Sequence, residues 1–535
     1  MASIPHLRRQ GTATQLIVDG QPFLMLAGEL HNSSSSALEY MESIWPRLEA
    51  LRLNTVLAPV NWELVEPREG EFDFALVDGL IDGAHRRGMR LVFLWFGTYK
   101  NTWSTYAPAW VKTDVKRFPR TQVEPGRNCG QICVLSEEAA GADARAFAAL
   151  MRHIRATDGE RQTVVMMQVE NEVGLLGARR DVSPLAEAAF AGKVPAELTA
   201  YLVQQRGALR EEVREPWQRA SRCAQAGTWR QVFGDASEEI FMAWHMARFV
   251  NRVAAAGRAE YDLPMYANAW LMQHAGQPPG KYPSGGPVAH MLDVWRAAAP
   301  AIDFLAPDIY VPEFAAVCAD YARGGNPLMI PEARADQGMA AKAFYAIGQH
   351  DAMCYAPFGI EDTVAPSAPA GDATTLACAN PVAEVDAYVA AGRETAGLLR
   401  QTYRLLSDML PEIAAAHGSG RMRGFLQSAA QQEEFELGGC RLRVNWNRPY
   451  DPARPPAGGL VIAREDYSFF VAGYGFWIDL FPAAGQGGAI DFLEIWEGDF
   501  RAGAFVRGRR LNGDEYMLRL GPPPGVLQAR VYRYE

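Results

Sequence analysis

The chain has 535 residues, of which 49% are hydrophobic and 21% charged, and its formal net charge is -10. This composition is that of a folded globular protein, and an acidic chain without a cluster of Lys and Arg argues against nucleic acid as a partner. No uncharged apolar run reaches about 18 residues, so we expect no membrane span. The length exceeds one average domain, although an α/β barrel with insertions can occupy well over half of it.

Seven cysteines are scattered through the sequence. A chain of this length needs no disulfide framework, so we expect mostly reduced, buried thiols. Cys129 and Cys133 are the only close pair, and no second Cys or His cluster completes a tetrahedral site, so we expect neither a metal nor a cofactor. The first ten residues lack the apolar core of a signal peptide. The expected location is cytoplasmic as the sequence stands, and periplasmic if a signal peptide was removed.

The first expected element is a hairpin at residues 16–23, which turns at Asp19-Gly20 and could close the bottom of a barrel. Short apolar runs then predict eight strands, at residues 23–27, 55–60, 91–96, 164–169, 264–267, 304–309, 328–330 and 353–356. Amphipathic stretches between them predict helices, among them residues 39–52, 76–87, 139–155 and 240–256. Eight βα units favour an α/β fold, the (β/α)8 TIM barrel. An open doubly wound sheet is the alternative, but the first strand lacks the Gly-rich phosphate turn of that fold.

Residues 1–400 are predicted to form this barrel, with a long insertion after strand four that could shape a substrate entrance. A helix-like stretch at residues 385–415 then leads to a break at residues 418–420. The chain becomes strand-like beyond it, so we predict a C-terminal all-β domain over residues 416–535. Within this domain, Asn512-Gly513 is expected to turn a hairpin. The Pro- and Ala-rich residues 365–370 are expected to be a loop.

Two of the predicted strands end in glutamates. Residues 164–167 (VVMM) lead to Glu170 and Glu172, and residues 327–331 (PLMIP) lead to Glu332. The carboxyl ends of barrel strands open into one mouth, so Glu172 and Glu332 should meet there as a catalytic pair that can cleave a glycosidic bond. A separation of roughly 5–5.5 Å would indicate retention, and about 6.5–9.5 Å inversion. Glu170 is the alternative acid, although a buried structural role fits it better.

Other residues at strand ends are candidate sugar contacts. The aromatic rings of Trp95, Trp270 and Tyr310 could stack on the apolar face of a sugar, and each could equally fill the core. Tyr310 could also donate a hydrogen bond to the nucleophile and hold its charge. Asn268 could bind a hydroxyl group, and His31 is either a structural histidine or a binding residue.

Residues 168–174, QVENEVG, resemble the Q-[VI]-E-N-E-[YV]-G motif of glycoside hydrolase family 35, the retaining β-galactosidases. Three further segments resemble motifs of the same family: AGELH at residues 27–31, which contains Glu29 and His31; Asn61 with GEFDF at residues 70–74; and PAW at residues 108–110. The resemblance implies a retaining mechanism in which Glu172 is the acid/base and Glu332 the nucleophile. It also implies that Asn171 contacts the sugar 2-hydroxyl.

The sequence departs from this family at two strand ends. Typical members end strand three with a Glu-Trp pair followed by Gly-Gly, which helps to bind galactose, whereas residues 94–99 (LWFGTY) contain no acid. Glu332 is followed by ARAD in place of an aromatic-rich segment. The chain therefore resembles a divergent subgroup with an added C-terminal β domain. That domain could bind polysaccharide, cover the barrel or join subunits of a homo-oligomer.

We therefore expect a retaining exo-β-glycosidase, in the first place a β-galactosidase acting on terminal non-reducing β-D-galactosyl residues of an oligosaccharide or polysaccharide. The missing strand-three acid keeps two other retaining glycosidases open, of the β-glucosidase or arabinopyranosidase type. The alternative from another class is a non-catalytic carbohydrate-binding protein on a glycosidase scaffold.

Overall fold

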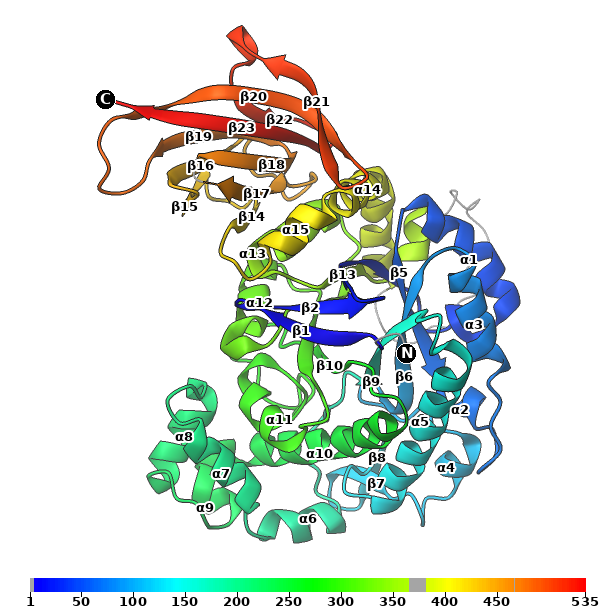
Figure 1. Ribbon diagram of the computed structural model, residues 1–535. Helices are drawn as coiled ribbons and strands as arrows, with labels where there is room; N and C mark the ends of the chain where they lie inside the picture. Colours follow the sequence, from blue (N-terminus) through cyan, green and yellow to red (C-terminus); the bar gives the residue numbers. More distant parts are fainter. Residues whose placement is uncertain (1–3, 365–381, 466) are drawn as a thin grey trace.

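The computed structural model describes residues 4–364, 382–465 and 467–535. Eight parallel strands close into a barrel in the order β10-β11-β12-β13-β4-β5-β6-β9 (Figure 1). These strands are β4 (Met25–Glu29), β5 (Thr55–Asn61), β6 (Arg90–Lys100), β9 (Val164–Asn171), β10 (Met265–Trp270), β11 (Phe304–Ile309), β12 (Ile330–Ala333) and β13 (Cys354–Pro357). Each predicted apolar run overlaps one of them, so the predicted (β/α)8 barrel is confirmed.

A major helix follows each barrel strand and covers the outside of the barrel. These helices are α1 (Leu38–Ala50), α3 (Ala75–His85), α5 (Glu137–Asp158), α10 (Ser237–Glu260), α11 (Leu292–Ala298), α12 (Phe314–Tyr321), α13 (Met339–His350) and α14 (Val382–Asp408). In α1 the buried residues Met41, Ile44, Trp45 and Leu48 recur every three or four positions. This spacing gives one apolar stripe that faces the barrel, and it explains why the sequence pattern located the helices.

The N-terminal hairpin covers the amino end of the barrel. Strands β1 (His6–Gln10), β2 (Ala13–Val18) and β3 (Gln21–Phe23) form a small antiparallel sheet, and β1 and β2 lie in front of the barrel in Figure 1. Leu16 and Val18 belong to the same buried cluster as Met25, Phe304 and Met353 inside the barrel. The prediction that this hairpin closes the bottom of the barrel is therefore confirmed.

Two insertions lie beside β9, the strand that leads to Glu172. A hairpin of β7 (Arg120–Glu124) and β8 (Arg127–Ile132) follows β6 and the short helix α4 (Ala109–Thr113). The long insertion after β9 holds the helices α6 (Pro184–Ala191), α7 (Ala196–Gln204), α8 (Glu211–Ser221) and α9 (Trp229–Phe233). In Figure 1, α7, α8 and α9 lie at the lower left and α6 lies at the bottom. No helix in the described ranges is long and apolar enough to cross a membrane.

The C-terminal region is a sandwich of two antiparallel sheets. The six-stranded sheet has the order β14-β17-β18-β23-β20-β21 and the four-stranded sheet the order β15-β16-β19-β22. Their strands are β14 (Met422–Leu426), β15 (Gln432–Leu437), β16 (Cys440–Trp446), β17 (Gly458–Glu465), β18 (Ser468–Tyr474), β19 (Phe476–Pro482), β20 (Ala489–Arg501), β21 (Ala504–Leu511), β22 (Leu518–Leu520) and β23 (Gly525–Tyr534). The predicted all-β character of this region is confirmed.

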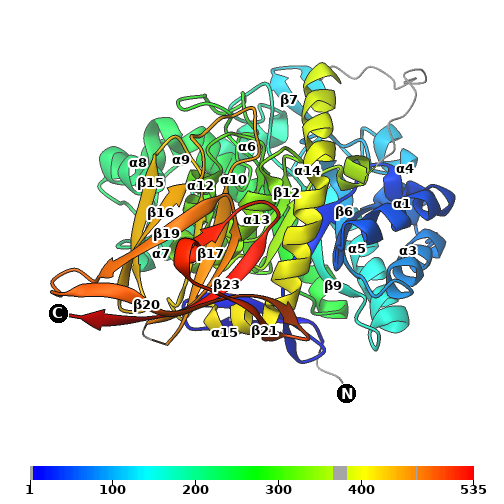
Figure 2. The ribbon, with the colours of Figure 1, turned by 90° about the horizontal axis from the view of Figure 1, so that it is seen from above.

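The larger sheet is covered on both faces. On β17, Val461 and Ala463 pack between the two sheets, whereas Leu460 and Ile462 belong to the core that includes the outer helices of the barrel. Successive side chains of a strand point to opposite faces, so both sets are buried at once. The C-terminal domain is consequently docked through its sheet against the barrel, and Figure 2 shows α14 running between the two.

Two predictions for the C-terminal half need correction. Asn512-Gly513 does not turn a hairpin: β21 pairs with β20 in one sheet, whereas β22 pairs with β19 in the other. The chain switches sheets there through a short 3-10 helix. The helix-like stretch at residues 385–415 is interrupted at Met409, which separates α14 from α15 (Leu410–Ala416). The expected loop at residues 365–370 lies outside the described residues, and the domain boundaries at 400 and 416 stay predictions.

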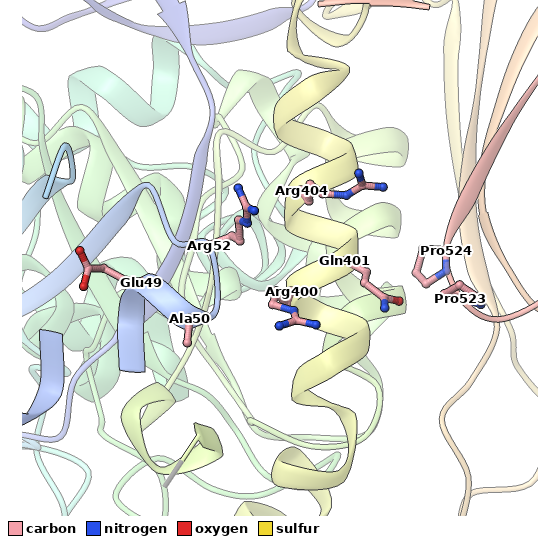
Figure 3. A pocket seen from close by; sticks show the side chains of 8 residues that line it. All are labelled: Glu49, Ala50, Arg52, Arg400, Gln401, Arg404, Pro523 and Pro524. Atoms are coloured by element: carbon pink, nitrogen blue, oxygen red, sulfur yellow. The ribbon is translucent and has the colours of Figure 1, made fainter. Parts of the chain in front are cut away.

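An open cavity of about 700 Å³ lies where α1, α14 and the C-terminal domain meet. Figure 3 shows Arg400 and Arg404 on α14 between Arg52 and the Pro523-Pro524 segment. Arg52 precedes β5, so this cavity lies toward the amino ends of the strands. Glu49 is the only acid among its lining residues. It therefore offers no pair of carboxylates and is separate from the site described next.

Candidate active site

A layer of polar side chains closes the carboxyl end of the barrel. On β11, Phe304 and Ala306 point into the apolar barrel interior. Every second side chain of a strand points the same way, so the buried Asp308 is the next one to do so. Strand alternation brings the corresponding residues of other strands to the same level. They are Glu29 on β4, Asn61 on β5, Asn268 on β10, Asp308 on β11 and Glu332 on β12, and all are buried.

The end of β9 reaches this layer through an unusual turn. Glu170 and Glu172 both have left-handed backbones, with φ of 61° and 46°. Such conformations cost free energy in residues other than glycine and cluster at functional sites. The carboxylate of Glu170 accepts backbone N–H groups of Tyr99 at 2.6 Å and of Thr98 at 3.4 Å. Glu170 therefore fastens β9 to β6, which leaves Glu172 as the candidate acid.

Glu172, Glu332 and Asp308 form a compact group. One carboxylate oxygen of each lies within 4.8 Å of the others. This upper limit on the approach of the Glu172 and Glu332 oxygens lies below the about 6.5–9.5 Å of inverting glycosidases and agrees with the closer pairs of retaining enzymes, at roughly 5–5.5 Å. Oxygen donors so arranged could also hold a cation, and the expectation that no metal is needed stays a prediction.

The environments of the two glutamates differ. Burial, and then the charge of Glu332, raise the pKa of Glu172 to about 8, although Lys100 opposes this rise. Glu172 therefore carries its proton at neutral pH. Glu332 instead accepts the phenolic O–H of Tyr310 at 2.5 Å. The expected contact between Tyr310 and the second glutamate is present.

Asn268 links the acid to Asp308. Its Oδ1 accepts the backbone N–H of Glu172 at 3.0 Å, and its Nδ2 donates to Oδ2 of Asp308 at 2.7 Å. Both hydrogen bonds are buried. Asn268 thus holds the turn that carries Glu172, and it does so with the amide that sequence reasoning assigned to a sugar hydroxyl.

Several buried polar atoms at this level have no hydrogen-bond partner within the described part of the chain. They are both carboxylate oxygens of Glu29, Oδ1 of Asn61, Nδ2 of Asn171 and Oε2 of Glu332. Burial and the charge of Glu332 raise the pKa of Glu29 well above its ordinary value. Unpaired buried polar groups are costly, and a ligand rich in hydroxyl groups would supply both donors and acceptors for them.

His31 and Trp270 lie nearer the rim. Nε2 of His31 lies 2.8 Å from Asp362, and its ring packs edge-on against Phe358. Burial opposes protonation of His31, but the hydrogen bond with Asp362 and the charge of Glu361 raise its pKa. Trp270 ends β10 and is partly exposed. The structure therefore pairs His31 with an acid of the rim and leaves Trp270 accessible at the mouth.

Trp95 does not belong to the site, which corrects the sequence prediction. Its side chain points out of the barrel, where its ring packs against Phe147 of α5. Its indole N–H donates to Asp143 of the same helix at 2.8 Å. On β6 the interior positions are Val92, Leu94 and Phe96. Residues 91–96 are apolar on both faces, so the sequence could not reveal which face points inward.

Sequence reasoning missed two buried residues of the site, Asp308 and Lys100. Asp308 interrupts the predicted strand at residues 304–309, and a lone acid inside an apolar run was the available signal. Lys100 lies four residues beyond the predicted end of its strand, because β6 continues to Lys100 across an irregularity in register. No count from the apolar run could have assigned it to the mouth.

The model of Glycosyl hydrolases family 35 matches residues 15–228, which contain Glu29, Asn61, Asn171 and Glu172. This segment of the chain is similar to glycosyl hydrolases family 35. It covers the first half of the barrel and the strand that leads to the candidate acid. Residues 399–520, from the end of α14 to β22, match a domain of unknown function, DUF5597.

A curated relative of the chain is the beta-galactosidase of Xanthomonas manihotis, which is 28% identical over 177 residues. The match covers 32% of this chain and only 27% of the length of the relative. Among solved structures, the beta-galactosidase of Rahnella sp. R3 has a TM-score of 0.46 at 15% identity and covers 76% of this chain and 58% of its own. A GH42 beta-galactosidase from G. stearothermophilus has a TM-score of 0.46 at 13% identity, with 98% and 100% covered.

Proposed function

We propose that this chain is a retaining exo-β-glycosidase, a β-galactosidase that removes terminal non-reducing β-D-galactosyl residues from an oligosaccharide or polysaccharide. The observation that carries the proposal is the pair Glu172 and Glu332: one oxygen of each lies within 4.8 Å of the other, and the raised pKa of Glu172 keeps its proton on it at neutral pH. A protonated acid this close to a second carboxyl group is what double displacement requires. The match of residues 15–228 to the family 35 model and the name of the curated relative support galactose.

In the first step, Glu172 donates its proton to the glycosidic oxygen as the bond from that oxygen to the anomeric carbon breaks. The carboxylate of Glu332 attacks the same carbon, and a covalent glycosyl ester forms. Esterification removes the charge of Glu332, which had raised the pKa of Glu172, so this pKa falls. Glu172 then takes a proton from water, the water oxygen attacks the anomeric carbon, and Glu332 leaves as a carboxylate.

The sugar itself has one competing assignment. Typical family members carry an acid at the end of strand three that helps to bind galactose, whereas residues 94–99 on β6 contain none. This difference favours keeping β-glucosides and α-L-arabinopyranosides as second candidates. A non-catalytic sugar-binding role is less well supported, because it gives no reason for a protonated acid beside a second carboxylate.

Hydrolysis of nitrophenyl β-D-galactoside by the wild-type protein and by Glu172→Gln tests the proposal. The anomer released first is followed by NMR. We expect β-galactose first, with turnover lost in the variant. Release of α-galactose first would refute retention, and turnover of the glucoside or arabinopyranoside alone would reassign the sugar. Sugar binding without turnover of any glycoside would favour the non-catalytic alternative.

A further inference from the structure

Lys100 is a buried cation in a site otherwise dominated by acids. Only 6% of its surface is exposed. Its Nζ donates to Oδ1 of Asn171 at 3.0 Å and lies 4.7 Å from the centre of the Phe96 ring. Lys100 is also paired in register with Asn171 across β6 and β9. Both its backbone and its side chain are therefore directed at the residue that precedes the candidate acid.

The backbone around Lys100 is strained. The turn that follows has two left-handed residues other than glycine, Asn101 with φ of 50° and Thr102 with φ of 69°. Lys100 and Trp103 close this turn with two backbone hydrogen bonds, of 2.8 and 2.9 Å. Left-handed threonine is costly and persists only where the surroundings enforce it. Gln131 supplies part of this enforcement, because its Nε2 donates to the carbonyl oxygens of both Thr102 and Gly174 at 2.6 Å.

The hydrogen bond from Lys100 fixes which end of the Asn171 amide faces the site. An ammonium group can only donate, so the oxygen of the amide must face Lys100. The nitrogen of the amide must then point the other way. Within the described residues this buried Nδ2 has no hydrogen-bond partner. It is therefore presented as a donor to an oxygen of the ligand.

We propose that Lys100 is a positioning residue: it locks the amide of Asn171 so that Nδ2 donates to the 2-hydroxyl oxygen of the bound sugar beside Glu172. The inference rests on the proposed function. Hydrogen bonds to this hydroxyl strengthen in the transition state of glycoside hydrolysis. A fixed amide offers that bond without reorganisation, whereas a free amide can turn its oxygen toward the sugar.

A second consequence of this arrangement is electrostatic. Four carboxyl groups face one another in the mouth of the barrel, namely Glu172, Glu29, Asp308 and Glu332, and Lys100 is the cation that lowers the pKa of Glu172 and Glu29. Replacement of Lys100 by a neutral residue should raise the pKa of Glu172 further. The alkaline limb of the rate profile should then move to higher pH, which a purely structural role would not cause.

The test compares Lys100→Met with the matched control Lys116→Met, which alters an exposed lysine in the turn after α4. Nitrophenyl β-galactoside and its 2-deoxy analogue are used as substrates, so that the intrinsic reactivity of the 2-deoxy sugar cancels between proteins. We expect the preference of wild type for the 2-hydroxyl, measured as the ratio of kcat/KM values, to fall about tenfold or more in Lys100→Met. The control should keep the wild-type ratio and alkaline limb. An unchanged ratio and an unchanged limb in Lys100→Met would overturn the inference.

Binding separates this inference from the proposed function. Calorimetry with D-galactose and 2-deoxy-D-galactose needs no turnover, and wild type should prefer galactose while Lys100→Met should not. A wild-type protein that turns over no glycoside but shows this difference would refute the enzyme and keep the role of Lys100. If Lys100→Met does not fold, Asn171→Asp replaces it, because a carboxylate still accepts from Lys100 but cannot donate to the sugar. Retained preference for galactose in that variant would overturn the inference.

Discussion

Glu172→Gln should abolish turnover and stabilise the folded protein. The ordinary pKa of a glutamate is 4.5, and burial together with the charge of Glu332 raises that of Glu172 to about 8 in the folded state. Between these two pH values, the folded protein holds a proton that the unfolded chain has released. Stability must therefore fall as pH rises through this range, and glutamine removes the cause because it is neutral in both states.

The size of the effect follows from the two pKa values. Each pH unit between them lowers the stability of wild type by about 1.4 kcal/mol relative to the variant. The free energies of unfolding of the two proteins should thus differ least near pH 4.5. At pH 7 the variant should be more stable than wild type by about 3 kcal/mol. Above pH 8 the folded carboxyl group also ionises, so the difference should level off.

Urea unfolding at pH 5, 6, 7 and 8 measures this difference. Glu160→Gln is the matched control, because Glu160 is an exposed carboxylate on the surface. It should follow wild type at every pH. A difference between Glu172→Gln and wild type that does not change with pH would refute the reasoning, since it would mean that Glu172 is ionised in the folded protein. Loss of turnover in the same variant ties this buried proton to catalysis.

Further predictions concern the catalytic roles of Glu332 and Glu172, the pH dependence of activity, the hydrogen bond from Tyr310, and Trp95. Glu332→Gly should be inactive, and azide should restore turnover with a glycosyl azide of inverted configuration, whereas rescue of Glu172→Ala should give the retained azide; normal turnover in both variants would exclude the assignment. Wild-type activity should fall as pH rises through about 8, where Glu172 loses its proton, and a rate that is flat to pH 10 would contradict its role as acid. Tyr310→Phe removes the hydrogen bond to Glu332 and should lower kcat on the order of tenfold to a hundredfold, and unchanged kinetics would show that this bond is dispensable. Trp95→Phe leaves Asp143 without its indole donor, so it should lower the free energy of unfolding in urea by about 2 kcal/mol and leave KM unchanged. A raised KM with unchanged stability would show that Trp95 contacts the sugar.

The sequence determined the architecture of the barrel and its candidate catalytic pair. Eight apolar runs separated by amphipathic stretches can close only into a few folds, because each strand needs cover on both faces and each helix on one. A parallel barrel then brings every carboxyl strand end to one mouth. Glu172 and Glu332 could be paired for that reason, although 160 positions separate them.

Only the tertiary structure decided which side chains reach that mouth. Trp95 and Phe96 are neighbours in an apolar run, and the phase that sends one outward and the other inward depends on how the strand sits in the closed barrel. Lys100 enters the site because β6 continues past an irregularity in register that no periodicity predicts. At Asn512 the turn signal is likewise overridden, because β22 pairs with β19 in the other sheet and not with the preceding strand β21. The proton on Glu172 depends in turn on burial and on the charges of Glu332 and Lys100, which come from strands far apart in the chain.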